Sequence, residues 1–328
     1  MIRLTDITLS CLDVYDPTGE QLSQLCGLLL NIGADYTELS VKAFRKMGAL
    51  PPGGRYILRC ESIMQAREYP QFGTYVCHRT GRCAPAGLIS EIQVNDIREI
   101  PLLNRYGSLQ SVRIRGLDDV LSHDYKPAFH ALRQSFPGRV QLCPENRYHC
   151  ATAIAVEWLL DGGNEAAASF AGIGGYAAIE EVLMALRLEI RRKPNFDFSI
   201  LPGIKALIEE ITKEPVPARK PVIGEDIFLV EAGIHVDGII KNPKIYEPYQ
   251  PELVGNARRL VLGKHSGKAS VRLKMKELSL PEASADVAKL LSEVRRESIR
   301  LQRSLTDSEF LSLYKAVSQN FDGGGDDT

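Results

Sequence analysis

Residues 140–170 read VQLCPENRYHCATAIAVEWLLDGGNEAAASF, and this stretch decides the fold class. A short apolar run, Val140–Cys143, precedes a longer amphipathic stretch, His149–Leu160, and a second short run, Glu165–Phe170, follows a pair of glycines. The short runs have the length of strands and the stretch between them has the length of a helix. A strand, a helix and a strand in this order predict a parallel sheet with helices packed outside it.

The same alternation extends through the first two hundred residues. Further strands are expected before this stretch, at Ile2–Leu9, Tyr36–Val41, Arg55–Cys60, Thr74–Cys77, Leu88–Val94 and Ser111–Ile114. Further helices are expected at Glu20–Ile32, Lys126–Ser135, Ala177–Arg191 and Leu201–Ile211. About eight strands over roughly 200 residues favour a (β/α)8 TIM barrel over an open sheet.

The pattern changes after about residue 195. Pro215, Pro217 and Pro221 indicate a linker, because proline cannot continue a helix. A short strand, Arg258–Leu262, and later helical patterns predict a small α/β and helical C-terminal region. The expected domains are a barrel over 1–213, a Pro-rich linker over 214–222, post-barrel subdomains over 223–320 and a disordered tail over 321–328.

The composition limits the classes of function that the chain can have. The chain has 328 residues, of which 44% are hydrophobic and 25% charged, as is ordinary for a globular protein. The net charge of −1 argues against nucleic acid as a partner, and no apolar run approaches the ~20 residues that span a membrane. Without a signal peptide at its start, the chain is expected to be cytoplasmic, with its seven scattered cysteines reduced.

Residues 232–267 read AGIHVDGIIKNPKIYEPYQPELVGNARRLVLGKHSG. This stretch resembles the segment after the barrel in homocitrate synthases of the nitrogen-fixation type and, more loosely, in 2-isopropylmalate synthases. Both are metal-dependent TIM-barrel enzymes that condense acyl-CoA with a 2-oxo acid. The HVDG and LGKHSG signatures carry the resemblance.

The resemblance implies a reaction in which acetyl-CoA loses a methyl proton and attacks the keto group of 2-oxoglutarate, giving homocitrate and CoA after thioester hydrolysis. A divalent metal polarises the keto group, an arginine stabilises the developing oxyanion and a base removes the proton. A neighbouring subunit's post-barrel segment lends a histidine and a tyrosine to the site. His235 and Tyr246 match these two residues.

The opening strand of the family usually reads DTTLRDGEQ, and residues 6–13 read DITLSCLD. Ser10 therefore stands where the oxyanion arginine belongs, and Cys11 stands where the metal-binding aspartate belongs. Asp13 stands near the position of the glutamate. A seryl hydroxyl cannot replace a guanidinium cation at an oxyanion.

Two later motifs also depart from the family. Its metal strand usually reads HxHND, where this chain has CPENR with Cys143 first and Glu145 third, so both metal histidines are absent. Its next loop usually reads NGxGERAGN, where this chain has AGIGGY with Gly175 fifth, and the Glu-Arg pair and last asparagine are missing. Hard, oxygen-loving metals bind poorly to a site of Cys11, Cys143 and Glu145.

The leading hypothesis is a subunit of a homocitrate-synthase-like enzyme whose own barrel site is degenerate. It would donate His235 and Tyr246 in trans to a homologous subunit with an intact barrel, in the service of nitrogenase cofactor synthesis. The divalent metal would not be bound by this chain's own barrel, and acetyl-CoA would be a substrate of the complex. The expected assembly is a hetero-oligomer or a homodimer.

Two other functions stay open. The chain could act alone on an acyl-CoA and a 2-oxo acid, with Cys11, Cys143 and Glu145 as a remodelled, zinc-binding site. It could instead be a non-catalytic regulatory partner of a complete synthase. Each candidate residue also has a purely structural interpretation: Tyr246 could simply pack in a Pro-rich loop, and His265 is expected to close the LGKHSG loop.

Overall fold

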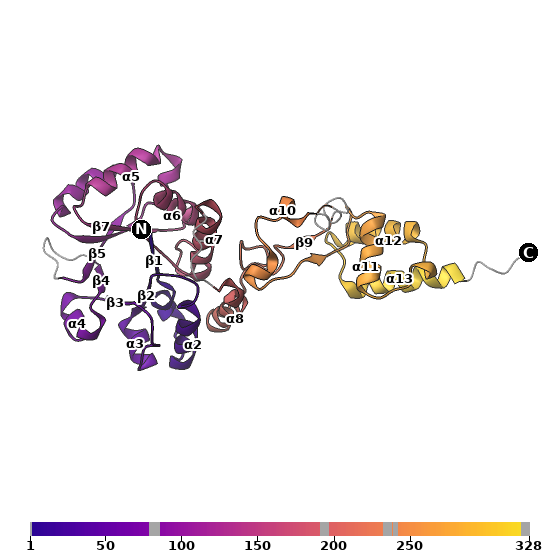
Figure 1. Cartoon of the computed structure of the whole chain (residues 1–328), viewed down its shortest axis with the longest axis horizontal. Coiled ribbons are helices and arrows are strands. Elements are labelled where there is room, and N and C mark those ends of the chain that lie inside the picture. Colours follow the sequence, from indigo (N-terminus) through magenta and orange to yellow (C-terminus); the bar gives the residue numbers. More distant parts are fainter. Residues whose placement is uncertain (1, 79–85, 191–196, 232–237, 239–241, 323–328) are drawn as a thin grey trace, which may run out of the picture. The chain divides into compact units, whose positions relative to one another are not determined.

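The computed structural model describes residues 2–78, 86–190, 197–231, 238 and 242–322 (Figure 1). The chain divides into two compact units, Met1–Gly224 and Glu225–Thr328, and each is described by itself. Among the described residues, no helix has the length and apolar character needed to cross a membrane.

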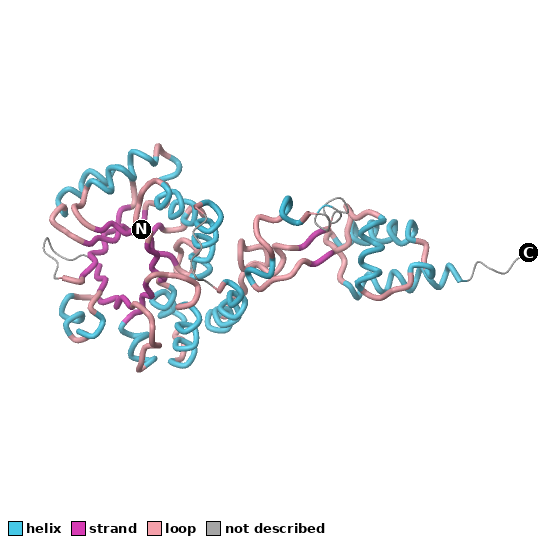
Figure 2. Tube along the Cα trace, in the orientation of Figure 1, coloured by secondary structure: helices cyan, strands magenta, loops and turns pink. Residues whose placement is uncertain are grey.

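The first unit contains a closed barrel of eight parallel strands arranged in chain order, with β1 pairing with both β2 and β8. Figure 2 shows the ring of strands surrounded by helices. The strands are β1 (Arg3–Asp6), β2 (Tyr36–Ser40), β3 (Tyr56–Cys60), β4 (Tyr75–His78), β5 (Leu88–Val94), β6 (Ser111–Gly116), β7 (Arg139–Pro144) and β8 (Glu165–Ala168). This architecture confirms the predicted (β/α)8 TIM barrel.

Helices follow most of the strands. They are α1 (Thr8–Cys11), α2 (Gly19–Leu29), α3 (Val41–Met47), α4 (Ile63–Arg67), α5 (Tyr125–Gln134), α6 (Ala151–Leu160), α7 (Ile179–Glu189) and α8 (Leu201–Thr212). Local sequence sets several starts: Thr18 and Gln21 form a capping box at α2, and the Ser40 hydroxyl accepts a hydrogen bond from Ala43 N at α3. Between β5 and β6 the connection is instead a 3-10 helix, η3 (Ile97–Tyr106).

The first strand is shorter than the expected Ile2–Leu9. It ends at Asp6, whose buried carboxylate accepts a hydrogen bond of 2.8 Å from Thr8 N and so turns the chain into α1. The last strand stops at Ala168 rather than Phe170, because Phe170 begins a 3-10 turn (η5, Phe170–Gly172). Both corrections move residues from the strands into the loops at the carboxyl ends of the strands, where barrel active sites lie.

The interior of the barrel has an apolar part and a charged part. Ile57, Val76 and Ile89 form a buried cluster with Tyr36 against it. Further along the same strands the inward positions are charged, as described below. The single tryptophan of the chain, Trp158 on α6, is fully buried, and its indole donates a hydrogen bond of 2.8 Å to Glu165 O on β8.

The second unit is small and largely helical. It has a parallel pair of two-residue strands, β9 (Leu229–Val230) and β10 (Arg259–Leu260), and the helices α10 (Pro243–Tyr246), α11 (Lys268–Glu277), α12 (Val287–Leu301) and α13 (Asp307–Asp322). Its core includes Leu262, Val271, Leu290, Val294 and Phe310.

The Pro-rich loop contains the one-turn helix α10 and a 3-10 turn, η7 (Pro251–Val254). One feature of this unit differs from the sequence expectation. Helix α13 reaches Asp322, so it includes the first two residues of the expected tail.

Candidate functional site

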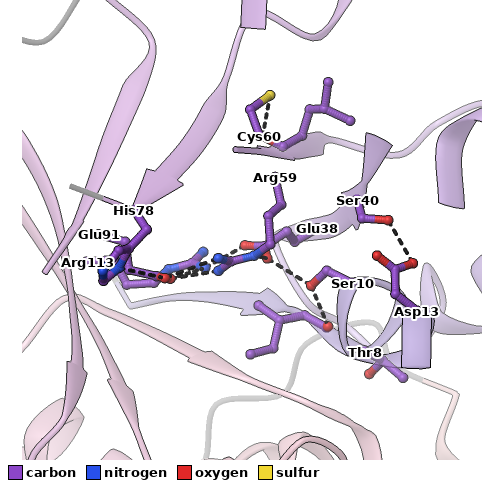
Figure 3. A network of polar contacts seen from close by, with 12 residues as sticks. Thr8, Ser10, Asp13, Glu38, Ser40, Arg59, Cys60, His78, Glu91 and Arg113 are labelled. Carbon is purple, nitrogen blue, oxygen red and sulfur yellow. Dashed lines mark hydrogen bonds and ion pairs between the residues drawn. The ribbon is translucent and has the colours of Figure 1, made fainter. Parts of the chain in front are cut away.

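Four charged side chains occupy the inside of the barrel beyond its apolar layer (Figure 3). Glu38 comes from β2, Arg59 from β3, Glu91 from β5 and Arg113 from β6. Arg59 Nε lies 2.7 Å from Glu38 Oε1, and Arg59 Nη2 lies 2.6 Å from Glu91 Oε2. Arg113 Nη1 lies 2.6 Å from Glu38 Oε2. Two guanidinium groups and two carboxylates therefore form a closed, neutral network, which we call the interior ion-pair network.

The network fixes its members in their charged states. Burial opposes ionisation of Glu38, but Arg113 and Arg59 outweigh it and lower the pKa of this carboxyl. Burial also raises the pKa of Glu91, yet hydrogen bonds from Arg59 bring it to about 2. A general base must take up a proton near neutral pH, and neither carboxylate is suited to that task.

Ser10, at the position of the family's arginine, faces this network. Its hydroxyl lies 2.8 Å from Glu38 Oε1 and 2.9 Å from Ile7 O, so its single hydrogen can be donated to one of them at a time. Asp13 lies beside it, and its Oδ1 accepts a hydrogen bond of 2.9 Å from the Ser40 hydroxyl. Burial raises the pKa of Asp13. The Arg59 guanidinium shares Glu38 Oε1 with the Ser10 hydroxyl, and it is itself paired with Glu38 and Glu91.

Cys11 and Cys143 lie in one apolar cluster at the ends of β1 and β7. The cluster contains Ile7, Cys143 and Ala167, with Cys11 and Tyr176 packed against it. Burial raises the pKa of both thiols, that of Cys143 to about 12. Two thiols in an apolar cluster offer only soft sulfur donors, which suit hard, oxygen-preferring divalent cations poorly.

The loop between β8 and α7 covers this cluster. A Cβ on Gly174 would lie 3.1 Å from Cys11 Sγ, so the loop backbone runs directly over that sulfur. The Tyr176 ring packs beside it, with the Arg115 guanidinium 5.2 Å from the ring centroid. Gly175, with φ of 79°, accepts a hydrogen bond of 2.8 Å from Asn146 N, which ties this loop to the one after β7.

Glu145 is held by cations. Arg115 Nε lies 2.8 Å from Glu145 Oε1, and Arg147 Nη2 lies 3.3 Å from Glu145 Oε2. Gln93 Nε2 donates to Oε2 at 3.3 Å as well. These contacts occupy both oxygens of the carboxylate.

A cavity of about 550 Å³ opens at the ends of β2, β3 and β4. Its lining includes Ser40, Lys42, Lys46, Arg59, Cys60 and His78. Lys42 and Lys46 both pair with Asp16 Oδ1 at 2.8 Å. Neither Cys11 nor Cys143 lines this cavity.

The post-barrel candidates belong to the second unit. His235 lies outside the described residues. Tyr246 ends α10 with 42% of its surface exposed, and a Cβ on Gly238 would come within 2.3 Å of its ring. The Tyr246 ring thus lies on the backbone of Gly238, the glycine of the HVDG signature.

The LGKHSG loop has a structural role. Glu231 Oε1 accepts a hydrogen bond of 2.8 Å from His265 N, and Arg295 Nη2 donates to Ser266 O at 2.7 Å. Ser266 is fully buried, and its hydroxyl accepts a hydrogen bond of 2.9 Å from Gly263 N. The loop thereby connects the end of β9 to α12.

Comparison with known proteins now places the chain. It aligns over 92% of its length with the omega subunit of homocitrate synthase from Clostridium pasteurianum, covering 92% of that protein at 37% identity. The chain belongs to the homocitrate synthase family. Residues 222–300 also match the family model described as "Homocitrate synthase post-HMGL domain-like". This confirms the resemblance found in the sequence.

Other homocitrate synthases align over a shorter part. Homocitrate synthase 1 of Nostoc sp. is 36% identical over 54% of this chain, and the alignment spans 48% of that protein. Among solved structures, hydroxymethylglutaryl-CoA lyases of Bacillus subtilis and Pseudomonas aeruginosa share the fold, with TM-scores of 0.52 and 0.53 at 14% identity. They cover 66% of this chain and 96% and 94% of their own lengths.

Members of the homocitrate synthase family use a divalent metal, and the residues at the corresponding place in this chain do not fit one. The donor set consists of two thiols in an apolar cluster and one carboxylate engaged by two arginines. Within the described ranges, no group of three or more His, Cys, Asp or Glu side chains could hold a metal ion. We therefore derive no catalytic step through a metal on this barrel.

Sequence reasoning did not single out the interior ion-pair network or the role of Tyr176. One signal for the network was present, because Glu38, Arg59, Glu91 and Arg113 interrupt otherwise apolar strand patterns. A charged residue in the middle of a buried strand requires a partner inside the protein. Which residues pair with one another depends on the closure of the barrel, which the sequence does not display.

Proposed function

We propose that this chain is a subunit of a homocitrate-synthase-like enzyme and that its own barrel does not perform the condensation. Its post-barrel segment would instead complete the site of a homologous subunit with an intact barrel. The reaction of that complex would join acetyl-CoA to 2-oxoglutarate, and its product would serve nitrogenase cofactor synthesis.

The observation that carries the proposal is the state of the barrel at Cys11 and Cys143. Where the family resemblance calls for metal ligands, the chain has thiols packed with Tyr176 in an apolar cluster. Where it calls for an arginine at the oxyanion, the chain has the Ser10 hydroxyl beside Glu38, and the Arg59 cation there is neutralised by Glu38 and Glu91. A site without a Lewis acid and without an unpaired cation stabilises enolate and oxyanion charge poorly.

The preserved post-barrel segment supports the second half of the proposal. His235 and Tyr246 match the residues that a family member contributes to its neighbour, and residues 222–300 match the post-barrel family model. The relative from Clostridium pasteurianum is named as an omega subunit, which accords with an enzyme made of unlike chains.

The test is an assay of CoA release from acetyl-CoA and 2-oxoglutarate. The chain is measured alone and mixed with a homologue from the same genome that retains the DTTLRDGEQ motif. We expect activity in the mixture beyond that of the homologue alone, and none from this chain by itself. His235→Ala should reduce the gain by about 100-fold, the scale of a lost acid–base group.

His265→Ala provides a matched control, since it removes an exposed histidine of the same unit whose observed bond is made by its backbone. It should leave the gain in activity intact. Turnover by the chain alone would overturn the proposal in favour of a remodelled site. Full activity of an assembled His235→Ala complex would indicate a non-catalytic regulatory partner.

A further inference from the structure

Strands β3 and β4 each carry a cysteine near the carboxyl end. Cys60 and Cys77 are register partners in the parallel ladder, and both are free thiols with 4% and 1% of their surfaces exposed. Register partners on adjacent strands lie about 4.8 Å apart, and their side chains project from the same face of the sheet. The two side chains are therefore neighbours, and Cys60 Sγ also lies 3.8 Å from Leu58 O of its own strand.

Cys60 faces away from the interior ion-pair network. The preceding residue, Arg59, points into the barrel toward Glu38 and Glu91, and successive strand residues face opposite sides (Figure 3). Cys60 also lines the cavity of about 550 Å³. The cavity gives a small molecule a route to this sulfur, although the thiol pair is otherwise covered.

The pair has the chemistry of a reactive dithiol. The neighbouring Cys77 and burial raise the pKa of Cys60, whereas Cys60 and the Arg59 guanidinium lower the pKa of Cys77 against the effect of burial. Cys77 is therefore the more acidic thiol of the pair. Disulfide formation requires a Cα separation of about 4.4–6.8 Å, and register partners on adjacent strands fall inside that range.

We propose that Cys60 and Cys77 form a modification site, a vicinal dithiol that a small disulfide entering the cavity oxidises to an intramolecular disulfide. This site is separate from the proposed role of the post-barrel segment and does not depend on it.

The exchange has two steps. The Cys77 thiolate takes the proton of Cys60 while the Cys60 sulfur attacks one sulfur of the reagent, forms a mixed disulfide and expels one thiolate. The Cys77 thiolate then attacks the Cys60 sulfur, forms the Cys60–Cys77 bond and expels the second thiolate. The two protons of the dithiol pass to the two released thiolates, so one reagent disulfide is reduced to two thiols while the protein dithiol is oxidised.

Three of the other described cysteines provide internal comparisons. Cys11 and Cys143 lie in the apolar cluster under Tyr176, and burial raises the pKa of both. Cys26 is a single buried thiol near the Tyr56 hydroxyl, and burial raises its pKa to about 11. Neither arrangement combines a neighbouring thiol in strand register with an opening to a cavity.

The test treats the full chain with glutathione disulfide, blocks the remaining thiols by alkylation at low pH and maps the peptides by mass spectrometry. All proteins carry Cys83→Ser, because Cys83 lies outside the described residues. We expect a crosslinked Cys60–Cys77 peptide that dithiothreitol reverses, with Cys26 and Cys143 still reduced.

Two variants separate the steps. Cys77→Ser should trap the glutathione adduct on Cys60, formed at least about tenfold faster than any adduct on Cys26. Cys60→Ser should leave Cys77 unmodified. Trp158 fluorescence establishes that each variant is folded.

A reagent that bridges two thiols, phenylarsine oxide, tests the unsubstituted pair. It should bind with a stoichiometry of one and protect only Cys60 and Cys77 from alkylation. Oxidation confined to other cysteines, or reaction of Cys60 and Cys77 only in denaturant, would overturn the proposal.

Discussion

At the scale of single residues, the interior ion-pair network explains how charged side chains are accommodated at inward positions of the barrel. Glu38 and Arg113 are fully buried, and an isolated charge there would cost several kcal/mol. Each cation contacts both carboxylates, so no charge is left alone. The network stabilises a particular arrangement of strands while it leaves no group free for proton transfer.

Replacing one member of the network should therefore lower the free energy of unfolding strongly. Replacing an acid and its basic partner together should lower it much less. Arg113→Met is expected to lower the free energy of unfolding by about 3–5 kcal/mol, because Glu38 keeps its charge without its closest partner. The double variant Glu38→Gln/Arg113→Met should recover most of that loss, since Arg59 and Glu91 still pair. Denaturant unfolding followed by Trp158 fluorescence measures the wild type, the two single variants Arg113→Met and Glu38→Gln, and the double variant. Simple additivity of the two single effects would contradict this account.

At the scale of elements, the start of α7 shows how a loop is held by a buried carboxyl. Glu180 lies in the first turn of α7, fully buried, and its Oε2 accepts a hydrogen bond of 3.0 Å from Ala171 N. Lys220, in the segment after α8, lies 3.7 Å from Glu180 Oε1 and 2.7 Å from Glu181 Oε1. Burial dominates over Lys220 and raises the pKa of Glu180 from 4.5 to about 7.

A raised carboxyl pKa gives a definite sign to the pH dependence. Between about pH 4.5 and 7 the folded state holds a proton on Glu180 that the unfolded state has lost, so stability falls as pH rises. The loss amounts to about 3 kcal/mol in total. Glu180→Gln, which stays neutral and can still accept from Ala171 N, should flatten this part of the profile.

Chemical denaturation at a series of pH values provides the measurement for Glu180. Glu181→Gln, which removes the neighbouring carboxylate of the same turn, is the matched control. This variant should still lose stability as the pH rises. If the free energy of unfolding changed with pH equally in the wild type and in Glu180→Gln, Glu180 would not titrate in this range.

At the scale of the whole molecule, the two units have separate cores. The barrel unit holds the single tryptophan, and the second unit has its own buried cluster that includes Val271, Leu290, Val294 and Phe310. We therefore expect a substitution in the core of one unit to lower the free energy of unfolding of that unit. This division also lets the post-barrel segment be examined while the barrel serves as an internal reference.

Phe310→Ala should destabilise the second unit alone. Phe310 is 1% exposed, and removal of a buried phenyl group costs about 3–5 kcal/mol. Hydrogen exchange measured by mass spectrometry should show faster exchange in α11, α12 and α13. The barrel strands and the Trp158 unfolding transition should be unchanged. Equal acceleration of exchange in β1–β8 would indicate that the two units unfold together.

The sequence by itself determined the fold class and the family. Strands such as Leu88–Val94 and Tyr56–Cys60 are recognisable because apolar runs bounded by turn residues are local features. The ends of β1 and β8 were misplaced, since the Asp6–Thr8 turn and the turn at Ala171 depend on side-chain and backbone contacts that hydrophobicity does not encode. The changed positions at Ser10, Cys11 and Cys143 were also visible, because a motif is read one residue at a time.

Only the tertiary structure decided what those changes produce. The closure of the barrel brings Glu38, Arg59, Glu91 and Arg113 together from four strands, and it sets Cys60 beside Cys77. The loop between β8 and α7 places Gly174 and Tyr176 against Cys11, so Cys11 and Cys143 lie in an apolar cluster and burial raises the pKa of both thiols. Burial and pairing are properties of neighbours in space, and they set the charge of each group, which sequence spacing alone does not reveal.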